Sequence, residues 1–330
     1  MWWHRYAMTS EGLIKRHGQP WRVLRLQTAC RQLQRWLLLL VCWVPSMAYS
    51  SLPGEVSLPG TLEFTLVSPT TGQDYLIQVS IPDSPPPETG YSVMYLLDGN
   101  ARFALVQAAR DTLTRQGPDG ESDALMIVAV GYPDTERFNK ERRVEDFTPL
   151  LPNNNVAEND YQQRPHGGAD RFLSFIEGHL KPEINRRFAI NTEQEAIFGH
   201  SLGGLFVLHA LLTQPSSFDR YIAISPSLWW YGEKPLESLV QKTSSLAAIP
   251  NGTRLLIGVG ELEQPASDDV VTPRDQRMQA RAMVDNAQSV AEWLSTQQRN
   301  LKVGFTLFPG ETHGSVMWPA TRQAIEFLVE

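Results

Sequence analysis

The fold is decided by the stretch Glu195-Ala-Ile-Phe-Gly199-His-Ser201-Leu-Gly203-Gly-Leu-Phe-Val-Leu-His-Ala210. A short apolar run ends in Gly-x-Ser-x-Gly and a helical pattern follows at once, which is the arrangement of a nucleophile elbow on a sharp strand-to-helix turn. Such a turn is crowded, so we expect Gly199, Gly203 and Gly204 to be required there. The Leu202 amide falls at a helix N-terminus, where N–H groups lack intrahelical partners and favour negative charge. We predict that Ser201 is a nucleophile and that Leu202 provides half of an oxyanion hole.

Strand and helix patterns alternate on both sides of this stretch. Apolar patterning predicts further strands at 62–67, 75–81, 91–97, 124–130, 220–225, 253–260 and 302–308. Helical spacing predicts helices at 103–114, 169–186, 275–298 and 316–329, and a long irregular section at 134–168. The first two strands, joined by turn residues, form a predicted antiparallel hairpin. The alternation indicates an α/β fold: one domain with a mostly parallel central sheet and helices on both faces.

The chain has 330 residues, of which 42% are hydrophobic and 20% are charged, enough for one domain with a substantial core. The net charge of −7 is unevenly divided: residues 1–50 hold seven Lys or Arg and one Glu, so the remainder carries −13. An acidic body argues against a nucleic-acid partner, because phosphate binding needs clustered cations. The sequence shows no metal-ligand cluster and no nucleotide-binding loop, so we predict neither a metal nor another cofactor.

The N-terminal section has the pattern of a secretory signal with a long basic n-region. The apolar run at 36–44 is too short to cross a bilayer as a helix, and Ala48 and Ser50 after it are small residues at the positions that a signal peptidase reads. We predict cleavage after about Ser50, which leaves 51–330 as the domain, with no membrane span; an uncleaved anchor is the alternative. Both cysteines, Cys30 and Cys42, lie in this segment, so the mature chain would have no disulfide. Export to the periplasm or the medium fits this composition.

Unusual polar residues follow the predicted strands, where the active groups of open α/β sheets gather. They are Asp98-Gly99-Asn100, Ser201, Ser225, Glu261 with Glu263, and His313. We predict an active site at this edge of the sheet. The Asn100 amide is the expected second oxyanion donor, although Asp98-Gly99 can also be explained as a simple turn.

A serine hydroxyl needs a base, and His313 is the best candidate. It follows the last strand between two glycines, and the chain order Ser, acid, His is the one used in this kind of fold. The acid is Glu261 or Glu263, both directly after the strand that ends at Gly260. A Ser–His dyad with a backbone carbonyl that orients the imidazole remains an alternative.

Several motifs together resemble the putative-esterase (esterase D-like) family of the α/β hydrolases. They are Leu96-Leu-Asp-Gly-Asn100, Arg143-x-x-Asp-Phe-Thr-Pro149, Gly167-Gly-Ala169, Gly199-His-Ser-Leu-Gly-Gly204, Ser225-Pro-Ser-Leu-Trp-Trp230 and His313-Gly-Ser315. The resemblance covers about 60–329. It implies an α/β-hydrolase fold and a periplasmic serine esterase. Within the family the set is most similar to exported siderophore hydrolases, which open catecholate trilactones such as enterobactin.

The resemblance also implies that Arg142 or Arg143 holds catecholate or carboxylate groups of a small-molecule ester, by bidentate bonding and by ring stacking. A structural ion pair of Arg143 with Asp146 is the alternative. Trp229 and Trp230 would form an aromatic pocket wall, or simply pack in the core. Charge does not decide between an iron-loaded and an iron-free siderophore.

Two other functions stay open on the sequence. One is a general acyl, aryl-ester or thioester hydrolase or an acyltransferase, since the same serine chemistry can pass an acyl group to water or to another hydroxyl. The other is an inactive homologue that binds a ligand on an old hydrolase fold, since fold alone does not fix function.

Overall fold

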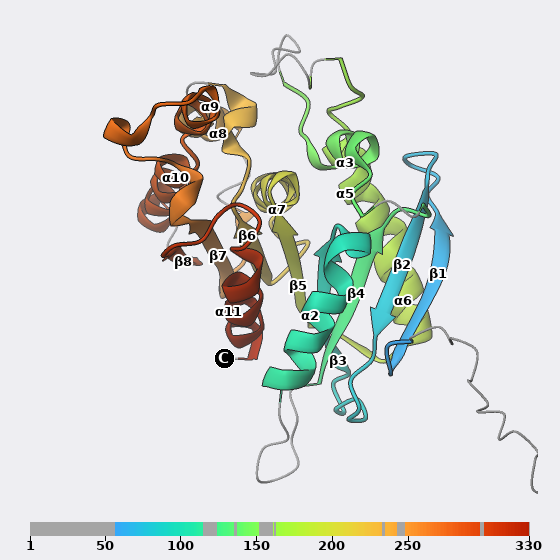
Figure 1. Cartoon of the computed structure of the whole chain (residues 1–330). Helices are drawn as coiled ribbons and strands as arrows, with labels where there is room; N and C mark the ends of the chain where they lie inside the picture. Colours follow the sequence, from blue (N-terminus) through green and yellow to red (C-terminus); the bar gives the residue numbers. More distant parts are fainter. Residues whose placement is uncertain are drawn as a thin grey trace, which may run out of the picture. The chain divides into compact units, whose positions relative to one another are not determined.

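The computed structural model describes residues 57–114, 124–134, 137–151, 161, 163–232, 235–242, 248–297 and 300–329. The predicted signal at 1–50 lies outside these residues. Across the described residues, eight strands form a sheet in the order β1-β2-β4-β3-β5-β6-β7-β8 (Figure 1). In chain order they are β1 (Thr61–Val67), β2 (Asp74–Ser80), β3 (Tyr91–Leu97), β4 (Leu125–Gly131), β5 (Ile190–His200), β6 (Arg220–Ile224), β7 (Thr253–Gly260) and β8 (Leu301–Phe308).

Strand directions match the predicted mostly parallel sheet. β1 pairs antiparallel with β2, which confirms the predicted hairpin, and β2 pairs antiparallel with β4. All pairings from β4 through β3, β5, β6 and β7 to β8 are parallel. The carboxyl ends of β3, β5, β6, β7 and β8 therefore meet at one edge of the sheet.

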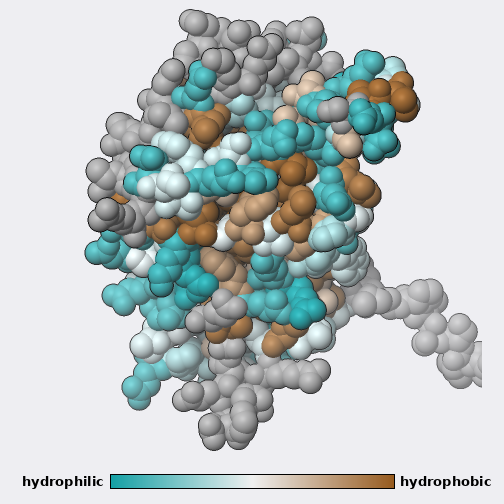
Figure 2. Space-filling model, turned by 90° about the vertical axis from the view of Figure 1, so that its left-hand side faces the viewer, coloured by the Kyte–Doolittle hydropathy of each residue, from teal (hydrophilic) through white to brown (hydrophobic). Residues whose placement is uncertain are grey.

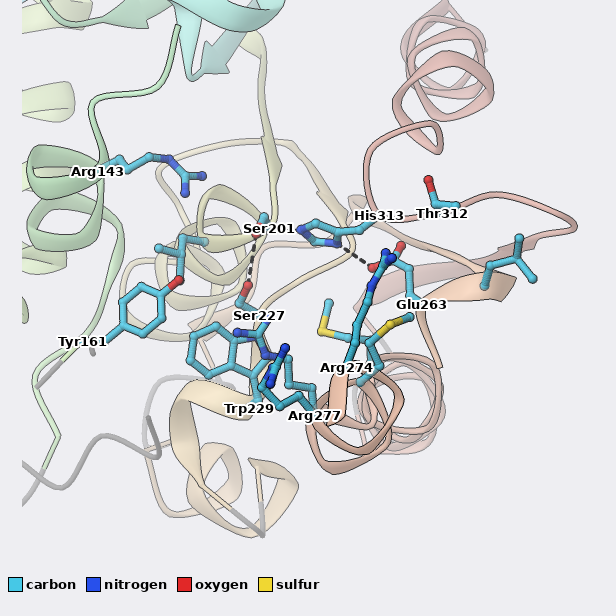
Figure 3. A pocket seen from close by; sticks show the side chains of 15 residues that line it. Arg143, Tyr161, Ser201, Ser227, Trp229, Glu263, Arg274, Arg277, Thr312 and His313 are labelled. Atoms are coloured by element: carbon cyan, nitrogen blue, oxygen red, sulfur yellow. Dashed lines mark hydrogen bonds and ion pairs between the residues drawn. The ribbon is translucent and has the colours of Figure 1, made fainter. Parts of the chain in front are cut away.

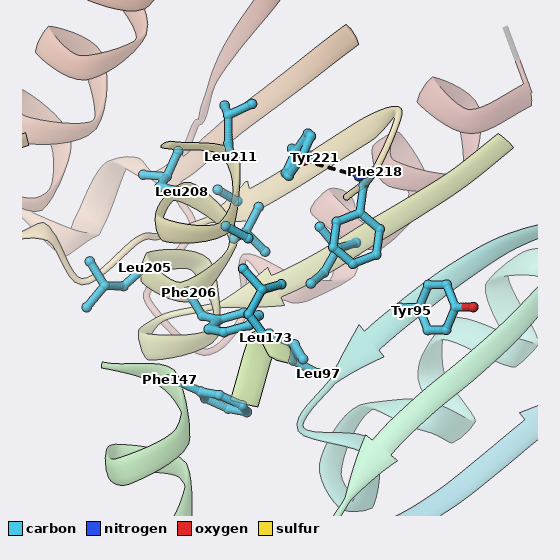
Figure 4. Close-up of a cluster of buried hydrophobic side chains, with 14 of the residues drawn as sticks. Tyr95, Leu97, Phe147, Leu173, Leu205, Phe206, Leu208, Leu211, Phe218 and Tyr221 are labelled. Carbon is cyan, nitrogen blue, oxygen red and sulfur yellow. Dashed lines mark hydrogen bonds between the residues drawn. The ribbon is translucent and has the colours of Figure 1, made fainter. Parts of the chain in front are cut away.

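Strand β3 shows why the central strands are apolar throughout. Its Val93, Tyr95 and Leu97 belong to the core on one face of the sheet, and Met94 and Leu96 belong to the core on the other. Helices α5, α7 and α10 cover the first face with their buried apolar residues, and α2 and α11 cover the second. Figure 4 shows part of the first core, including Leu97 and side chains from α7. A strand buried on both faces cannot alternate with polar residues.

The helices around the sheet include one helical segment with three parts, α5 (Ala169–Phe175), the π-turn η2 (Ile176–Leu180) and α6 (Lys181–Arg187), which confirms the helix predicted there. The other helices and short turns are α2 (Gly99–Leu113), α3 (Lys140–Phe147), α7 (Leu202–Thr213), η3 (Leu228–Tyr231), α8 (Pro235–Lys242), η5 (Glu261–Glu263), η6 (Ser267–Asp269), α9 (Pro273–Arg281), α10 (Met283–Gln297) and α11 (Met317–Val329).

Helix α2 begins four residues before its predicted start at 103. Asp98 adopts a left-handed conformation, with φ 57°, directly after β3. Its carbonyl oxygen accepts hydrogen bonds from the N–H groups of Ala101 and Arg102, at 2.9 and 3.1 Å. The chain therefore passes from strand to helix without a loop, and this fixes Asp98 at the edge where the predicted site lies.

The section at 134–168 is not irregular throughout, because α3 lies within it. The Asn139 side chain caps this helix by accepting the Arg142 N–H at 3.0 Å, and Val144 and Phe147 are buried. The prediction was wrong here because charged residues dominate the segment and leave too few apolar positions to show a period.

The helix predicted at 275–298 is broken into α9 and α10 at Ala282, which adopts a left-handed conformation with φ 44° and ψ 48°. Helix α10 buries Met283, Ala287 and other apolar residues, whereas α9 has no buried residue. The two halves have different environments: α10 packs on the core and α9 does not. Figure 1 shows them as separate helices.

The surface of the described residues mixes polar and apolar side chains. On the face shown in Figure 2, hydrophobic patches are interrupted by hydrophilic ones. None of the described helices combines the length and the apolar character needed to cross a membrane.

Candidate active site

Ser201 occupies a strained turn between β5 and α7, with φ 62° and ψ −119°. A side chain at Gly199 would overlap the carbonyl of Gly203, and one at Gly204 would place its Cβ 2.8 Å from the Ile224 carbonyl oxygen. These two glycines are required, as expected. At Gly203 a Cβ would meet only side-chain atoms at ordinary contact distance, 3.5 Å, so space does not require glycine there and that expectation was wrong.

A hydrogen-bonded chain runs from Ser201 through His313 to Glu263 (Figure 3). The Ser201 Oγ lies 3.0 Å from His313 Nε2, and His313 Nδ1 lies 2.6 Å from Glu263 Oε2. A carboxylate can only accept, so Nδ1 carries the proton toward Glu263 and Nε2 is left to accept the serine hydroxyl proton. This is the arrangement in which a histidine can act as general base toward a serine.

Glu263 is held by its own set of donors. Its side chain is 1% exposed, and Oε1 accepts hydrogen bonds from Ser225 Oγ at 2.5 Å and from the Gly260 N–H at 2.8 Å. These two bonds satisfy one oxygen and leave Oε2 for His313. Glu261 is placed differently: it is exposed and accepts the Gly310 N–H at 2.8 Å, so it braces the loop after β8. Of the two candidate acids, the structure brings Glu263 to the histidine.

His200, which the sequence analysis does not single out, holds the loop that carries His313. Its Nε2–H donates to the His313 carbonyl oxygen at 2.8 Å, and its Nδ1 accepts the Arg102 guanidinium at 3.2 Å. Burial, together with the nearby guanidinium groups of Arg102 and Arg143 and the neighbouring His313 imidazole, holds the pKa of His200 well below its usual range. The neutral ring therefore has one donor nitrogen and one acceptor nitrogen, as both contacts require. Its place between Gly199 and Ser201 was the available sequence signal.

The two predicted oxyanion donors lie at helix N-termini. Leu202 is the first residue of α7 and lines the cavity beside Ser201, and its N–H has no intrahelical acceptor. The Asn100 side chain is engaged with the end of β4: Nδ2 donates to the Tyr132 and Asp134 carbonyls at 2.9 and 3.2 Å, and Oδ1 accepts the Tyr132 N–H at 2.8 Å. These bonds fix the start of α2. The role of the Asn100 amide stays a prediction.

A cavity of about 420 Å³ opens at Ser201 and His313. The two predicted tryptophans differ in their relation to it. Trp229 lines the cavity, together with Tyr161, whose ring centroid is 5.3 Å away. Trp230 is fully buried in the core, and its indole N–H donates to the Pro149 carbonyl at 3.2 Å. Trp229 can therefore contact a ligand, whereas Trp230 packs beneath it.

Arg143 lines the cavity and forms a bidentate ion pair with Asp98, in which Nε and Nη2 each lie 2.9 Å from a carboxylate oxygen. The alternative partner, Asp146, was wrong: it accepts the Tyr75 and Tyr132 hydroxyls at 3.0 and 3.2 Å. Burial raises the pKa of Asp146 to about 7. The pair with Asp98 thus holds Arg143 through Nε and Nη2 at the wall of the cavity.

Arg142 does not line the cavity. Its guanidinium donates to the Asp74 carbonyl at 2.7 Å and lies over the rings of Tyr75 and Tyr132, at 5.1 and 4.6 Å. These contacts fasten α3 to the strands β2 and β4. Of the two predicted arginines, the structure brings Arg143 to the site.

Sequence reasoning missed the contribution of α9. Arg274, Arg277 and Arg281 from this helix line the cavity, as does Arg143 from α3. Their spacing of three and four residues places them on one helix face, so the pattern was available in the sequence. Ser227 was also missed; its Oγ lies 3.2 Å from Ser201 Oγ. Among the described residues, no group of three or more His, Cys, Asp or Glu side chains is arranged to hold a metal ion.

A mostly parallel sheet, a strained serine after β5 and a histidine after β8 define an α/β hydrolase. Comparison with known families refines this class. Residues 68–318 match the family described as Putative esterase, and the chain belongs to this family. It is a carboxylic ester hydrolase.

Characterised relatives and solved structures agree with this assignment. The chain is 37% identical to the ferri-bacillibactin esterase of Bacillus subtilis, over 82% of this chain and 90% of that protein. It is 35% identical to the siderophore enterobactin esterase of Emericella nidulans, over 72% of this chain and 82% of that one. The crystal structure of the BES protein from Bacillus cereus superposes with a TM-score of 0.72, at 32% identity, over 84% of this chain and 98% of the other.

Proposed function

We propose that this protein is a serine esterase that hydrolyses a catecholate siderophore trilactone of the enterobactin type. The observation that carries the proposal is the hydrogen-bonded chain Ser201–His313–Glu263 in a cavity with an aromatic and arginine-rich lining. The relatives named above act on siderophores, as their names state. An aromatic wall and guanidinium groups suit catechol rings and their oxygens.

The geometry supports a two-step mechanism. His313 Nε2 takes the proton of Ser201 as Oγ attacks the ester carbonyl, and the tetrahedral oxyanion faces the Leu202 and Asn100 amides. The C–O bond breaks, the alkoxide leaves with the proton from His313, and an acyl-enzyme remains on Ser201. Water, deprotonated by His313, then releases the acid and restores the serine. Glu263 fixes the imidazole tautomer and stabilises the positive charge that forms on it twice in each cycle.

The same proposal includes location. We infer that residues 1–50 direct export and are removed, so that the enzyme acts in the periplasm or outside the cell. The support is the basic section, the short apolar run and the small residues Ala48 and Ser50. The mass of the protein purified from the periplasmic fraction and the medium tests this. A form that begins near residue 51 is expected, and full-length protein in the membrane fraction would overturn it.

The test of the activity is release of linear product from enterobactin by the wild type and by Ser201→Ala. Loss of the nucleophile is expected to lower turnover by roughly 10⁵-fold or more, because the serine and histidine act as one unit. Retained turnover in Ser201→Ala would contradict the mechanism. If the protein hydrolyses a simple aryl ester but not enterobactin, the siderophore substrate is contradicted. Esters formed with an added alcohol would indicate acyl transfer. Failure of a serine-directed phosphonate to label the protein would indicate an inactive homologue.

A further inference from the structure

The turn Ser225-Pro226-Ser227, between β6 and η3, directs two side-chain hydroxyls into the active site. Ser225 Oγ donates to Glu263, at the far end of the catalytic hydrogen-bonded chain, and Ser227 Oγ lies 3.2 Å from the Oγ of the nucleophile Ser201. The first contact supports the acid. The second contact, drawn as a dashed line in Figure 3, reaches a reacting atom and has no part in the two-step mechanism given above.

Backbone hydrogen bonds fix Ser227 beside the nucleophile. The Ser227 N–H donates to the Ser201 carbonyl at 3.1 Å, and the Ser201 N–H donates to the Ile224 carbonyl at 2.9 Å. The two turns also pack closely, because a Cβ on Gly204 would lie 3.1 Å from the Pro226 Cα. Ser227 itself is 1% exposed and lines the cavity. The fold therefore sets the position of Ser227 relative to Ser201.

A structural role does not account for the Ser227 hydroxyl. Ser227 stands directly before η3, the position at which a serine side chain ordinarily accepts a backbone N–H, but its side chain makes no such cap. Among the described residues, the hydrogen bond of its Oγ is the one to Ser201 Oγ. A buried hydroxyl needs a partner, and here that partner is the nucleophile.

The direction of this hydrogen bond follows from the protons of the catalytic chain. His313 Nδ1 carries its proton toward Glu263, so Nε2 is an acceptor and takes the Ser201 hydroxyl proton. Ser201 Oγ has no second proton to give, and its lone pairs can only accept. Ser227 is therefore the donor, and the nucleophilic oxygen is bonded to its base on one side and to a donor on another.

We propose that Ser227 is a further catalytic residue, whose O–H stabilises the negative charge on Ser201 Oγ as this oxygen attacks and, above all, as it leaves in deacylation. The inference rests on the proposed serine mechanism and not on the identity of the ester. When the acyl-enzyme is hydrolysed, the bond between the acyl carbon and Oγ breaks, the electron pair stays on Oγ, and the proton on His313 Nε2 moves to it. The Ser227 proton stays on its own oxygen throughout and is donated to Oγ as a hydrogen bond.

The two chemical steps gain differently from this donor. In the free enzyme Ser201 Oγ belongs to a hydroxyl that already accepts the Ser227 hydrogen bond, so only part of its strength is gained during acylation. In the acyl-enzyme Oγ is the alkyl oxygen of an ester, a weak acceptor, and it becomes a strong acceptor as the C–O bond breaks. An interaction accelerates a step only as far as it strengthens between the ground state and the transition state. Deacylation should therefore depend on Ser227 more than acylation does.

The test is Ser227→Ala, assayed with enterobactin and with p-nitrophenyl acetate. Active sites are titrated with a serine-directed phosphonate, so that rates refer to active enzyme. Acid quench at saturating substrate, followed by mass measurement of the intact protein, gives the ratio of acylated to unacylated enzyme, and this ratio with kcat gives both rate constants. The matched control is Ser80→Ala, which removes another buried serine hydroxyl, one that accepts Arg110 Nη2 at 2.6 Å outside the cavity lining.

We expect Ser227→Ala to lower the rate constant of deacylation by roughly 10-fold and that of acylation by about 3-fold, the size of effect of one neutral hydrogen bond. The ratio of acylated to unacylated enzyme should then rise about 3-fold. Ser80→Ala is expected to keep the wild-type rate constants and ratio, because its hydroxyl contributes to stability alone.

Two results would overturn the inference alone. Rate constants of Ser227→Ala that equal those of the control, or exceed those of the wild type, would show that Ser227 does not assist Oγ. Equal losses in both steps, with an unchanged ratio, would show only a structural effect. Wild-type protein that resists the phosphonate or turns over neither ester would overturn the proposed mechanism, and the inference with it. Turnover of the aryl ester alone would overturn the siderophore substrate, and the aryl ester would then decide the inference.

Discussion

The catalytic chain and the α9 face, the three arginines Arg274, Arg277 and Arg281 on helix α9, line the same cavity but are built in opposite ways. Ser201, Glu263 and His313 follow strands of the central sheet, and the carboxylate of Glu263 is 1% exposed. The α9 face stands on a helix with no buried residue. Groups that transfer protons need fixed geometry, so they are attached to the core. Long cations that attract a ligand need solvent access and reach, and they tolerate a lightly packed support. The predictions below test this division.

The largest expected effect separates the two glutamates after β7. Glu263→Gln keeps the size and part of the bonding of the side chain but removes the charge that orients His313 and stabilises its protonated form. We expect kcat to fall by roughly 10³- to 10⁴-fold, with KM little changed. Glu261→Gln is the matched control, since Glu261 bonds only the Gly310 N–H among the described residues. Similar losses in both variants would contradict the assignment of the acid.

The second prediction concerns the support of His313. His200→Ala removes the N–H that holds the His313 carbonyl, so the imidazole should lose its position relative to Ser201. We expect kcat to fall by roughly 10- to 100-fold, with KM within about 2-fold, since small misplacements are costly in catalysis. His200→Gln, which can still donate to that carbonyl, is expected to recover part of the loss.

His209→Ala is the control for a merely structural effect. His209 is equally buried and bonds Asp170 at 2.7 Å, away from the cavity lining. It is expected to lower stability and to leave kcat per folded molecule unchanged. A kcat loss in His209→Ala as large as in His200→Ala would show that His200 does not act through His313.

The third prediction uses the pH dependence of stability. Burial and neighbouring positive groups lower the pKa of His200 in the folded state below its unfolded value of about 6.5. Between the two pKa values the unfolded chain binds a proton that the folded one does not, so this residue lowers the free energy of unfolding as pH falls below 6.5. Urea unfolding at pH 7.5 and 5.5 should show a smaller difference for His200→Gln than for the wild type. An equal or larger difference would contradict the neutral, buried ring.

These cases show how far the sequence alone can go. The need for glycine at 199 and 204, the alternation of strands with helices and the position of His313 after the last strand were predictable, because local rules of backbone space and of strand ends decide them. The acid was left open between Glu261 and Glu263, which are two residues apart on the short turn η5. Only the tertiary contacts of Ser225 and Gly260 distinguish them, and these contacts depend on how two strands meet.

The wrong or missed assignments of arginines also come from the tertiary structure. Arg142 and Arg143 are adjacent in the sequence, yet the first lies over two tyrosine rings and the second lines the cavity. Adjacent helical residues point in different directions, and a helix that was not predicted cannot assign those directions. The α9 face was missed for a different reason: the predicted helix at 275–298 ran through the break at Ala282, so no separate helix beside the cavity was expected.

The smallest expected effect is the loss of stability when arginines of α9 are substituted, and it tests most directly whether α9 is lightly packed. Arg274→Gln and Arg277→Gln should each change the free energy of unfolding by no more than about 0.5 kcal/mol, because exposed side chains on an unburied helix contribute little. Ser225→Ala, at the buried end of the catalytic chain, removes a donor to the Glu263 carboxylate and should cost about 1–3 kcal/mol. Urea unfolding at pH 7.5 measures both. A large loss in the arginine variants would mean that α9 is part of the stable core, and the division between a rigid catalytic edge and a lightly packed recognition helix would then be wrong.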